Sequence, residues 1–172
     1  MGSRWRQGRM QRLPLTGTWE ERLEHFRSWD RHPYWKLLGV EVVGLGPGTG
    51  RLHVALDPEK HGAWPHGGLV SSLVDMAAVV ALFTTYGAGD DDVIAHATAD
   101  LNVSFLDSVE GDDLFAEGRI VRKARTAAFG TTEVRDASDR LIALGRATFL
   151  IRREPVVSSG ASAQRPRNSS GK

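Results

Sequence analysis

The sequence of 172 residues contains no cysteine, which excludes disulfides, thiolate metal sites and cysteine nucleophiles. Long apolar runs are also lacking: the longest, Met76 to Phe83, has eight residues, whereas a membrane-spanning helix needs about 20. No apolar segment follows the arginines near the N-terminus, so we expect no signal peptide. The G-x-S-x-G motif of α/β-hydrolase serines is absent as well. We therefore expect a cytoplasmic protein with no membrane partner.

Charge is unevenly distributed, although the net charge is only +1. Residues 1–12 carry four arginines and no acid, and residues 152–172 carry five bases and one acid, so each end has a charge of +4. The body, residues 13–151, is left with −7. Binding to a phosphate backbone needs clustered positive charge. We therefore expect no nucleic-acid partner.

The chain is long enough for one domain with a sizeable core and too short for two ordinary ones. Both ends lack the periodic apolar residues of folded elements. We expect a basic disordered arm over residues 1–16, a folded domain over residues 17–152, and a disordered tail over residues 153–172.

The first half of the domain predicts one short helix and a β-hairpin. Thr18 and Glu21 have the spacing of a capping box, which starts a helix that runs to about residue 29. The β-like runs 39–45 and 51–57 flank a glycine-rich turn. A strand and not a helix follows these glycines, which excludes a dinucleotide-binding loop, since such a loop presents helix amides to the phosphates.

The second half predicts a long helix followed by four strands. Residues 67–86 are apolar nearly all the way round the helix, so other structure must wrap it. In residues 93–105 the odd positions are apolar and the even ones from 96 to 104 are polar, which predicts one dry and one wet face, with Thr98 on the wet face. The pattern indicates an α+β domain in which a curved, largely antiparallel sheet surrounds one helix. The other three predicted strands cover residues 114–122, 127–136 and 141–151.

The start of the long helix carries the chemistry that the sequence suggests. His66, Gly67 and Gly68 precede or open the helix, so the two glycine amides are among the unpaired donors of its first turn. With the positive end of the helix dipole, these amides can polarise a carbonyl oxygen and hold an oxyanion. His66 either caps the helix or takes part in the chemistry.

Asp75 is the only charged residue between His66 and Asp90. Its carboxylate reaches solvent, forms a hydrogen bond with Ser71 or Ser72, or takes part in catalysis. The catalytic alternative has weight because burying an unpaired charge costs several kcal/mol. Asp75 lies eight residues, or about 12 Å, along the helix from Gly67. Two groups so far apart cannot act on one carbonyl, so a shared site would need two subunits related by a two-fold axis.

The sequence resembles the hot-dog fold acyl-CoA thioesterases of the phenylacetate-pathway (PaaI-like) family over about residues 33–152. The resemblance rests on His66-Gly67-Gly68 with Asp75 nine residues after the histidine, and on the strand that begins Asp100-Leu101-Asn102. Residues 119–129 and 141–150 fit the last strands of the family. The family implies a hot-dog homodimer, often paired into a homotetramer, that hydrolyses acyl-CoA at the subunit interface. It implies no cofactor, because coenzyme A is part of the substrate.

The resemblance also implies roles for individual residues. The Gly67 amide would polarise the thioester carbonyl, His66 would help to place it, and Asp75 of the partner would be general base or nucleophile. Two departures from the family are Lys60, where many members have asparagine, and Ala124, where glycine is common. Residues with expected substrate contacts are Gly68, Thr98, Arg122, Lys123, Arg125, Thr126 and His61.

Several alternatives remain open beside this interpretation. One alternative is a non-catalytic hot-dog module that binds an acyl thioester as a ligand, and another is a dehydratase relative of the same fold. The bases at residues 122–125 would be ordinary surface charge, and the acidic runs 90–92 and 112–113 are interpreted as solvated turns. We expect no metal site, because the spacings of His53, His61, His66 and His96 match no common zinc pattern.

Overall fold

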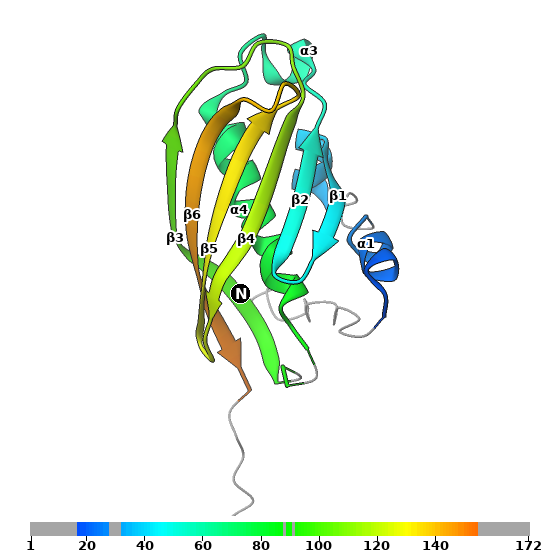
Figure 1. The fold of residues 1–172 in the computed structure, drawn as a ribbon, viewed down its shortest axis with the longest axis vertical. Helices are drawn as coiled ribbons and strands as arrows, with labels where there is room; N and C mark the ends of the chain where they lie inside the picture. Colours follow the sequence, from blue (N-terminus) through cyan, green and yellow to red (C-terminus); the bar gives the residue numbers. More distant parts are fainter. Residues whose placement is uncertain (1–16, 28–31, 88, 91, 155–172) are drawn as a thin grey trace, which may run out of the picture.

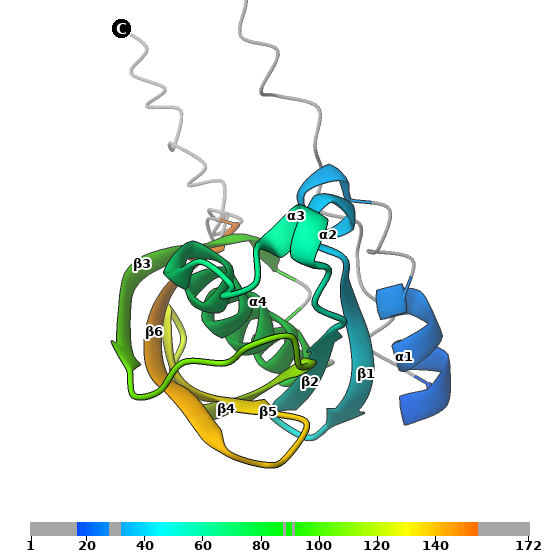
Figure 2. The same ribbon diagram turned by 90° about the horizontal axis from the view of Figure 1, so that it is seen from above.

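Six antiparallel strands curve around one long helix, α4 (Gly67–Thr84), in the computed structural model (Figures 1 and 2). The structure describes residues 17–27, 32–87, 89–90 and 92–154. The strand order is β1-β2-β4-β5-β6-β3, so the sheet is open, with β1 and β3 at its edges. The expected α+β hot-dog fold is confirmed. The strands are β1 (Val40–Gly46), β2 (Thr49–Val54), β3 (Val93–Phe105), β4 (Leu114–Lys123), β5 (Ala127–Asp136) and β6 (Leu141–Arg153).

Three short helices precede α4: α1 (Trp19–Arg27), α2 (Pro33–Leu38) and α3 (Pro58–His61). The capping box of α1 is present, since the Glu21 amide donates to Thr18 Oγ1 (3.2 Å) and the Thr18 amide donates to Glu21 Oε2 (2.8 Å). The sequence patterns did not predict α2, although it starts at a proline and ends at Gly39, whose φ of 68° is left-handed. α3 was likewise not predicted: its four residues follow directly after the second β-like run, whose last residue, Asp57, is the N-cap of the helix.

The core lies between α4 and the inner face of the curved sheet, which surrounds the helix in the view of Figure 2. By length and composition α4 could cross a membrane, but it is mostly buried by the sheet, as the core helix of a folded domain is. Glycines allow this close contact. A Cβ on Gly118 of β4 would overlap the backbone carbonyl of Ala77, and one on Gly145 of β6 would overlap the Val74 side chain. These positions therefore fix the distance between helix and sheet.

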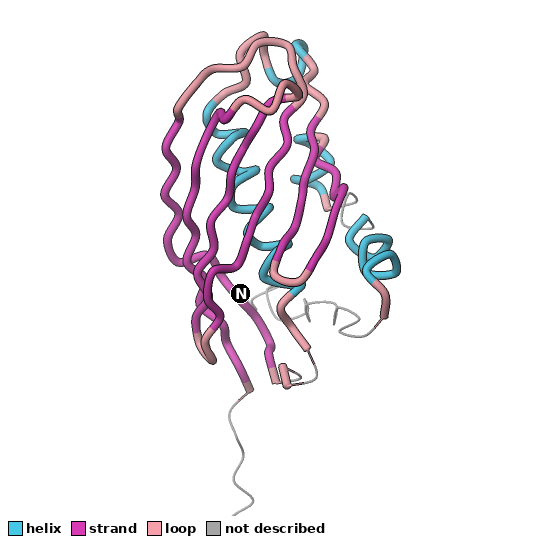
Figure 3. The backbone as a smooth tube through the Cα atoms, viewed as in Figure 1, coloured by secondary structure: helices cyan, strands magenta, loops and turns pink. Residues whose placement is uncertain are grey.

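Edge strand β3, a long strand beside β6 (Figure 3), shifts its register with β6 between Val93 and Ala95 and again at a β-bulge between Thr98 and Asp100. Thr98 pairs with the buried Phe149 of β6, whereas Val103 pairs with the buried Gly145, so both side chains face α4. Between them the register shifts at Ala99, which has no Cα partner. The predicted alternation therefore holds after the bulge and is wrong before it, because the extra residue reverses the parity of the inward positions.

The expected terminal segments lie largely outside the described residues, namely all of 1–16 and 155–172. Arg153, assigned to the tail by its composition, is the last residue of β6 and pairs with Asp90 and Asp92. The ordered strand thus extends slightly beyond the boundary expected at residue 152.

Candidate functional site

His66 is the N-cap of α4. Its Nδ1 accepts a hydrogen bond from the Gly68 amide at 2.9 Å. Nδ1 must be unprotonated to do so, and the ring proton of the neutral imidazole is therefore on Nε2. The Gly68 amide is satisfied within the protein, which leaves the Nε2 side of His66 for contact with a ligand.

Gly67 provides the amide that remains. Within the described part of the chain its N–H has no hydrogen-bond acceptor, as is usual for the first residue of a helix. A Cβ here would lie 3.3 Å from the ring of Phe105, the last residue of β3. The amide therefore sits beside an aromatic ring at the positive end of an 18-residue helix, which suits a developing negative charge.

Asp75 is held by the strand that crosses α4. Its Oδ1 accepts a hydrogen bond from Thr98 Oγ1 at 2.8 Å, and the residue is half-buried. The serine alternative is wrong for Ser72, whose hydroxyl donates to the Gly68 carbonyl (2.8 Å) and lies 2.7 Å from the Tyr34 hydroxyl. A single hydroxyl orients the carboxylate, and its second oxygen makes no hydrogen bond with the described residues.

The Asp75–Thr98 pair depends on the bulge. Strict alternation along β3 would turn Thr98 away from α4, whereas the register shift at Ala99 turns it inward. His96, two residues earlier, faces the same way, because it pairs with the buried Ile151. Its ring packs edge-on against Phe83 (centroids 4.7 Å apart) and Phe149 (6.3 Å). Burial lowers the pKa of His96, and the nearby Asp75 carboxylate partly opposes this.

His61 has a structural role in this arrangement. Its Nδ1 accepts from the Asp57 amide and its Nε2 donates to the Leu38 carbonyl, both at 3.0 Å, so the ring links α3 to the end of α2. Both ring nitrogens are engaged, and a substrate contact from His61 would have to break one of these bonds. The neighbouring Lys60 ammonium lies against Gly39, 3.1 Å from where a Cβ would be.

The basic residues on β4 and the turn after it have different surroundings. A bulge between Ile120 and Arg122 turns Arg122 outward and Lys123 inward. Lys123 Nζ donates to Asp90 Oδ2 (2.6 Å) and to the Thr85 carbonyl (3.0 Å), so it is not free for a substrate phosphate. Arg122, Arg125 and Thr126 are exposed, and Arg125 lies 3.6 Å from Asp92.

Asp90 and Asp92, in the acidic turn after α4, are paired with basic side chains, whereas the composition of the turn suggested a solvated segment. Arg153 donates to Asp90 at 2.7 Å and also to Asp92, alongside the bond from Lys123. Burial raises the pKa of Asp90, but hydrogen bonds from Lys123 and Arg153 outweigh this, and the pKa lies below its ordinary value. Asp113, in the second acidic run, accepts from His53 at 2.8 Å.

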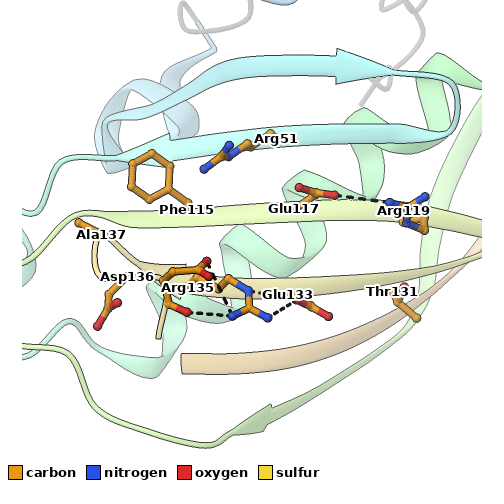
Figure 4. Close-up of a pocket in the computed structure, with 10 residues that line it drawn as sticks. Arg51, Phe115, Glu117, Arg119, Thr131, Glu133, Arg135, Asp136 and Ala137 are labelled. Carbon is orange, nitrogen blue, oxygen red and sulfur yellow. Dashed lines mark hydrogen bonds and ion pairs between the residues drawn. The ribbon is translucent and has the colours of Figure 1, made fainter. Parts of the chain in front are cut away.

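A hollow of about 600 Å³ lies on the outer face of β2, β4 and β5, away from α4 (Figure 4). Its charges compensate one another: Arg135 pairs with Glu133 at 2.8 Å, and Arg119 lies 3.6 Å from Glu117. None of the residues that line it belongs to the Gly67–Asp75 constellation. No group of three potential metal ligands occurs within the described ranges. The helix α4 and strand β3 therefore form the candidate site.

Comparison with known proteins is consistent with this location. A family model described as "Thioesterase superfamily" matches residues 65–143, which include the His66-Gly67-Gly68 motif and Asp75. A candidate esterase of Halobacterium salinarum is 32% identical over 137 residues, which cover 73% of this chain and 88% of that protein. The chain belongs to the thioesterase superfamily.

Other members of the thioesterase superfamily support the same assignment. Acyl-coenzyme A thioesterase 13 of Homo sapiens is 26% identical over 118 residues, which cover 66% of this chain and 81% of that protein. The crystal structure of zebrafish thioesterase superfamily member 2 superposes with a TM-score of 0.67 at 26% identity, over 80% of this chain and 100% of that one. Thioester hydrolysis is thus the general activity that membership supports.

Proposed function

We propose that the protein hydrolyses an acyl-CoA thioester to the free acid and coenzyme A, as members of the PaaI-like group do. The observation that carries the proposal is the placement of Asp75: one carboxylate on an otherwise uncharged helix, oriented by a hydroxyl from the facing strand. A protein that only binds a thioester does not need a charge at this position, whereas hydrolysis needs a base or a nucleophile.

The reaction follows from the groups available. The Gly67 amide donates to the thioester carbonyl oxygen and stabilises the negative charge that forms there. Asp75 accepts a proton from a water molecule as the water oxygen adds to the carbonyl carbon. Alternatively, the carboxylate attacks that carbon itself, the acyl group is transferred to Asp75 as a mixed anhydride when the thiolate leaves, and a water molecule then hydrolyses the anhydride to the free acid and regenerates the carboxylate. The carbon–sulfur bond then breaks, and the thiolate of coenzyme A leaves and takes up a proton. Thr98 holds Asp75 in place throughout.

Two subunits would build each site. Gly67 and Asp75 are eight residues apart on one rigid helix, about 12 Å along its axis, so the Gly67 amide of one subunit would serve the Asp75 of its partner. Edge strand β3 supports this arrangement, because it is 13 residues long, pairs with β6 alone among the described strands, and has mostly exposed side chains. Two antiparallel copies of β3 would continue the sheet across a homodimer. A dimer of dimers remains a further expectation, as does the cytoplasmic location.

Thiol release from a panel of acyl-CoAs tests the proposal, with Asp75→Asn as the matched variant. The wild-type protein should release coenzyme A from at least one acyl chain. Asp75→Asn should lower kcat by about a hundredfold or more, because a positioned base contributes that much. It should still bind the substrate and melt at or above the wild-type temperature, because asparagine keeps the size of the side chain without its charge.

Other outcomes would point elsewhere. Binding of acyl-CoA without any hydrolysis by the wild-type protein would identify a binding module. Near wild-type turnover by Asp75→Asn would remove Asp75 from the chemistry, and unfolding of this variant would indicate a structural aspartate.

A further inference from the structure

We propose that His96 is a positioning residue that acts through Asp75: the neutral ring leaves the carboxylate basic, and protonation of the ring weakens that base. This inference rests on the proposed function and adds a residue to its machinery. The placement of the ring on β3 carries it.

His96 and Thr98 occupy consecutive inward positions on β3, before the bulge. Consecutive positions on one face of a strand are separated by about 7 Å. Thr98 is bonded to Asp75 at 2.8 Å, so His96 is the next inward side chain after the one that holds the carboxylate. The field of Asp75 reaches the ring, where it favours the protonated form.

The surroundings of the His96 ring favour its neutral form. His96 Nδ1 is buried and has no hydrogen-bond partner, and the ring packs against Phe83 of α4 and Phe149 of β6. A proton on Nδ1 would be an unsatisfied donor beside two apolar rings, which is costly. The neutral tautomer with its proton on Nε2 avoids this cost.

Other charges near His96 are already compensated. Asp75 is the only charged residue of α4. Tyr86, which packs on Phe83, stays neutral because burial, followed by the charge of Asp90, raises its pKa to about 12. On β6, Arg153 is two residues beyond Ile151, the partner of His96, and it is bonded to Asp90 and Asp92. Asp75 and His96 therefore form the pair whose charges respond to each other.

The direction of the effect follows. As the pH falls, protonation of His96 would place a positive charge beside the Asp75 carboxylate. The new cation stabilises the anionic form of Asp75 and reduces its affinity for the proton of water. Turnover should therefore decline on the acid side with the titration of His96.

The first measurement needs no activity. Histidine titration by NMR should show a lower pKa for His96 than for an exposed histidine. In Asp75→Asn that pKa should fall further, by about half to one unit, because the nearby anion is gone. An unchanged His96 pKa in Asp75→Asn would overturn the proposal whether or not the protein hydrolyses acyl-CoA.

The second measurement is the pH profile of kcat/KM for His96→Phe, which keeps an aromatic ring between Phe83 and Phe149. Its acid limb should move by about half to one unit toward lower pH. His53→Phe is the matched control, since His53 also faces a carboxylate, Asp113, and stacks on a phenyl ring, but lies on β2. Its profile should coincide with that of the wild type.

His96→Gln serves as a second variant if the phenylalanine does not fold, and circular dichroism at each pH separates lost activity from lost structure. An acid limb unchanged in the folded His96 variant would overturn the proposal. Absence of hydrolysis by the wild-type protein would instead overturn the proposed function and leave the NMR result to decide the coupling of His96 and Asp75.

Discussion

Three cations lie within four residues at the end of β4, and their side chains have different tasks. Lys123 points inward and is bonded to Asp90 and to the carbonyl of Thr85, and its ammonium lies 4.6 Å from the centre of the Tyr86 ring. Arg122 points outward, and Arg125 is largely exposed. Lys123 thus stabilises the fold, whereas the two exposed arginines are the residues that we propose for contact with a phosphate-bearing substrate.

We expect Arg125→Ala, alone or with Arg122→Ala, to raise KM for acyl-CoA about threefold to tenfold and to change kcat little. An exposed arginine that contacts a phosphate contributes uniform binding energy, which affects the ground state and transition state alike. Lys123→Ala should instead lower the melting temperature. Michaelis kinetics at low salt make the measurement.

Arg146→Ala is the control for these variants, because Arg146 is also exposed but lies in the middle of β6. Its KM should match the wild-type value. An unchanged KM for Arg125→Ala at low salt would assign the arginines to ordinary surface charge.

At this scale the sequence predicted which residue types matter better than it predicted their surroundings. Asp75 and Gly67 could be singled out because a lone charge and a glycine pair are visible in the chain itself. Strict alternation placed Thr98 on the wet face, and its inward position depends on a bulge that the alternation does not reveal. The bond from Lys123 to Asp90 joins residues 33 positions apart, so no local pattern contained it.

Among the elements, α4 and the strands of the second half were predicted almost to the residue. Their apolar periodicity is strong, and β3 and β5 have the predicted bounds. The helices α2 and α3 were missed because four to six residues are too few for a helical period to appear. The strand order could not be predicted from local patterns either, because β2 pairs with β4 although all of α4 and β3 lie between them in the sequence.

The contact between α4 and β4 gives a prediction about stability. Gly118→Ala should lower the free energy of unfolding by about 1–3 kcal/mol, because the added methyl group would overlap the Ala77 backbone, which cannot rotate away. Chemical denaturation measures the change. Gly87→Ala is the control: a Cβ there meets nothing within 4 Å, so its stability should stay within about 0.5 kcal/mol of wild type.

Equal stability of the Gly118 and Gly87 variants would contradict the close approach of helix and sheet. Compensation by a small shift of α4 would show itself as a displaced helix in a crystal structure of Gly118→Ala, with a correspondingly smaller loss.

At the scale of the whole molecule, the proposed mechanism implies that a single chain holds two half-sites. Light scattering should therefore give a dimer or tetramer of the 18.8 kDa chain, and an active monomer at assay concentration would contradict the shared site. A mixing experiment is sharper, because it asks which subunit supplies which group.

The mixing experiment combines Asp75→Asn subunits with Gly67→Pro subunits. Proline at the first position of a helix removes the amide donor at little cost, and His66, with ψ of 141°, already has the conformation that a following proline requires. Each variant alone should be inactive. After subunit exchange, roughly a quarter of the wild-type activity should return, because half of the dimers are mixed and each mixed dimer has one intact site.

The matched control mixes Asp75→Asn with Thr98→Val, whose lesions affect the same half-site. Exchange should then yield no activity above the average of the two parents. In a mixed dimer, one site contains the Asp75→Asn substitution and the other contains Thr98→Val, so neither site is intact. Equal results in both mixtures would place Gly67 and Asp75 in one subunit's own site.

The extra residue in β3 affects which amino-acid substitutions this strand can accept during evolution. Ala99 separates a segment that faces Asp75, with His96 and Thr98, from a segment that packs against the start of α4, with Val103 and Phe105. Because each segment keeps its own phase relative to the sheet, an exchange of side chains in one leaves the orientation of the other untouched. One strand can thus vary its chemistry and its packing independently, with a single alanine as the border between them.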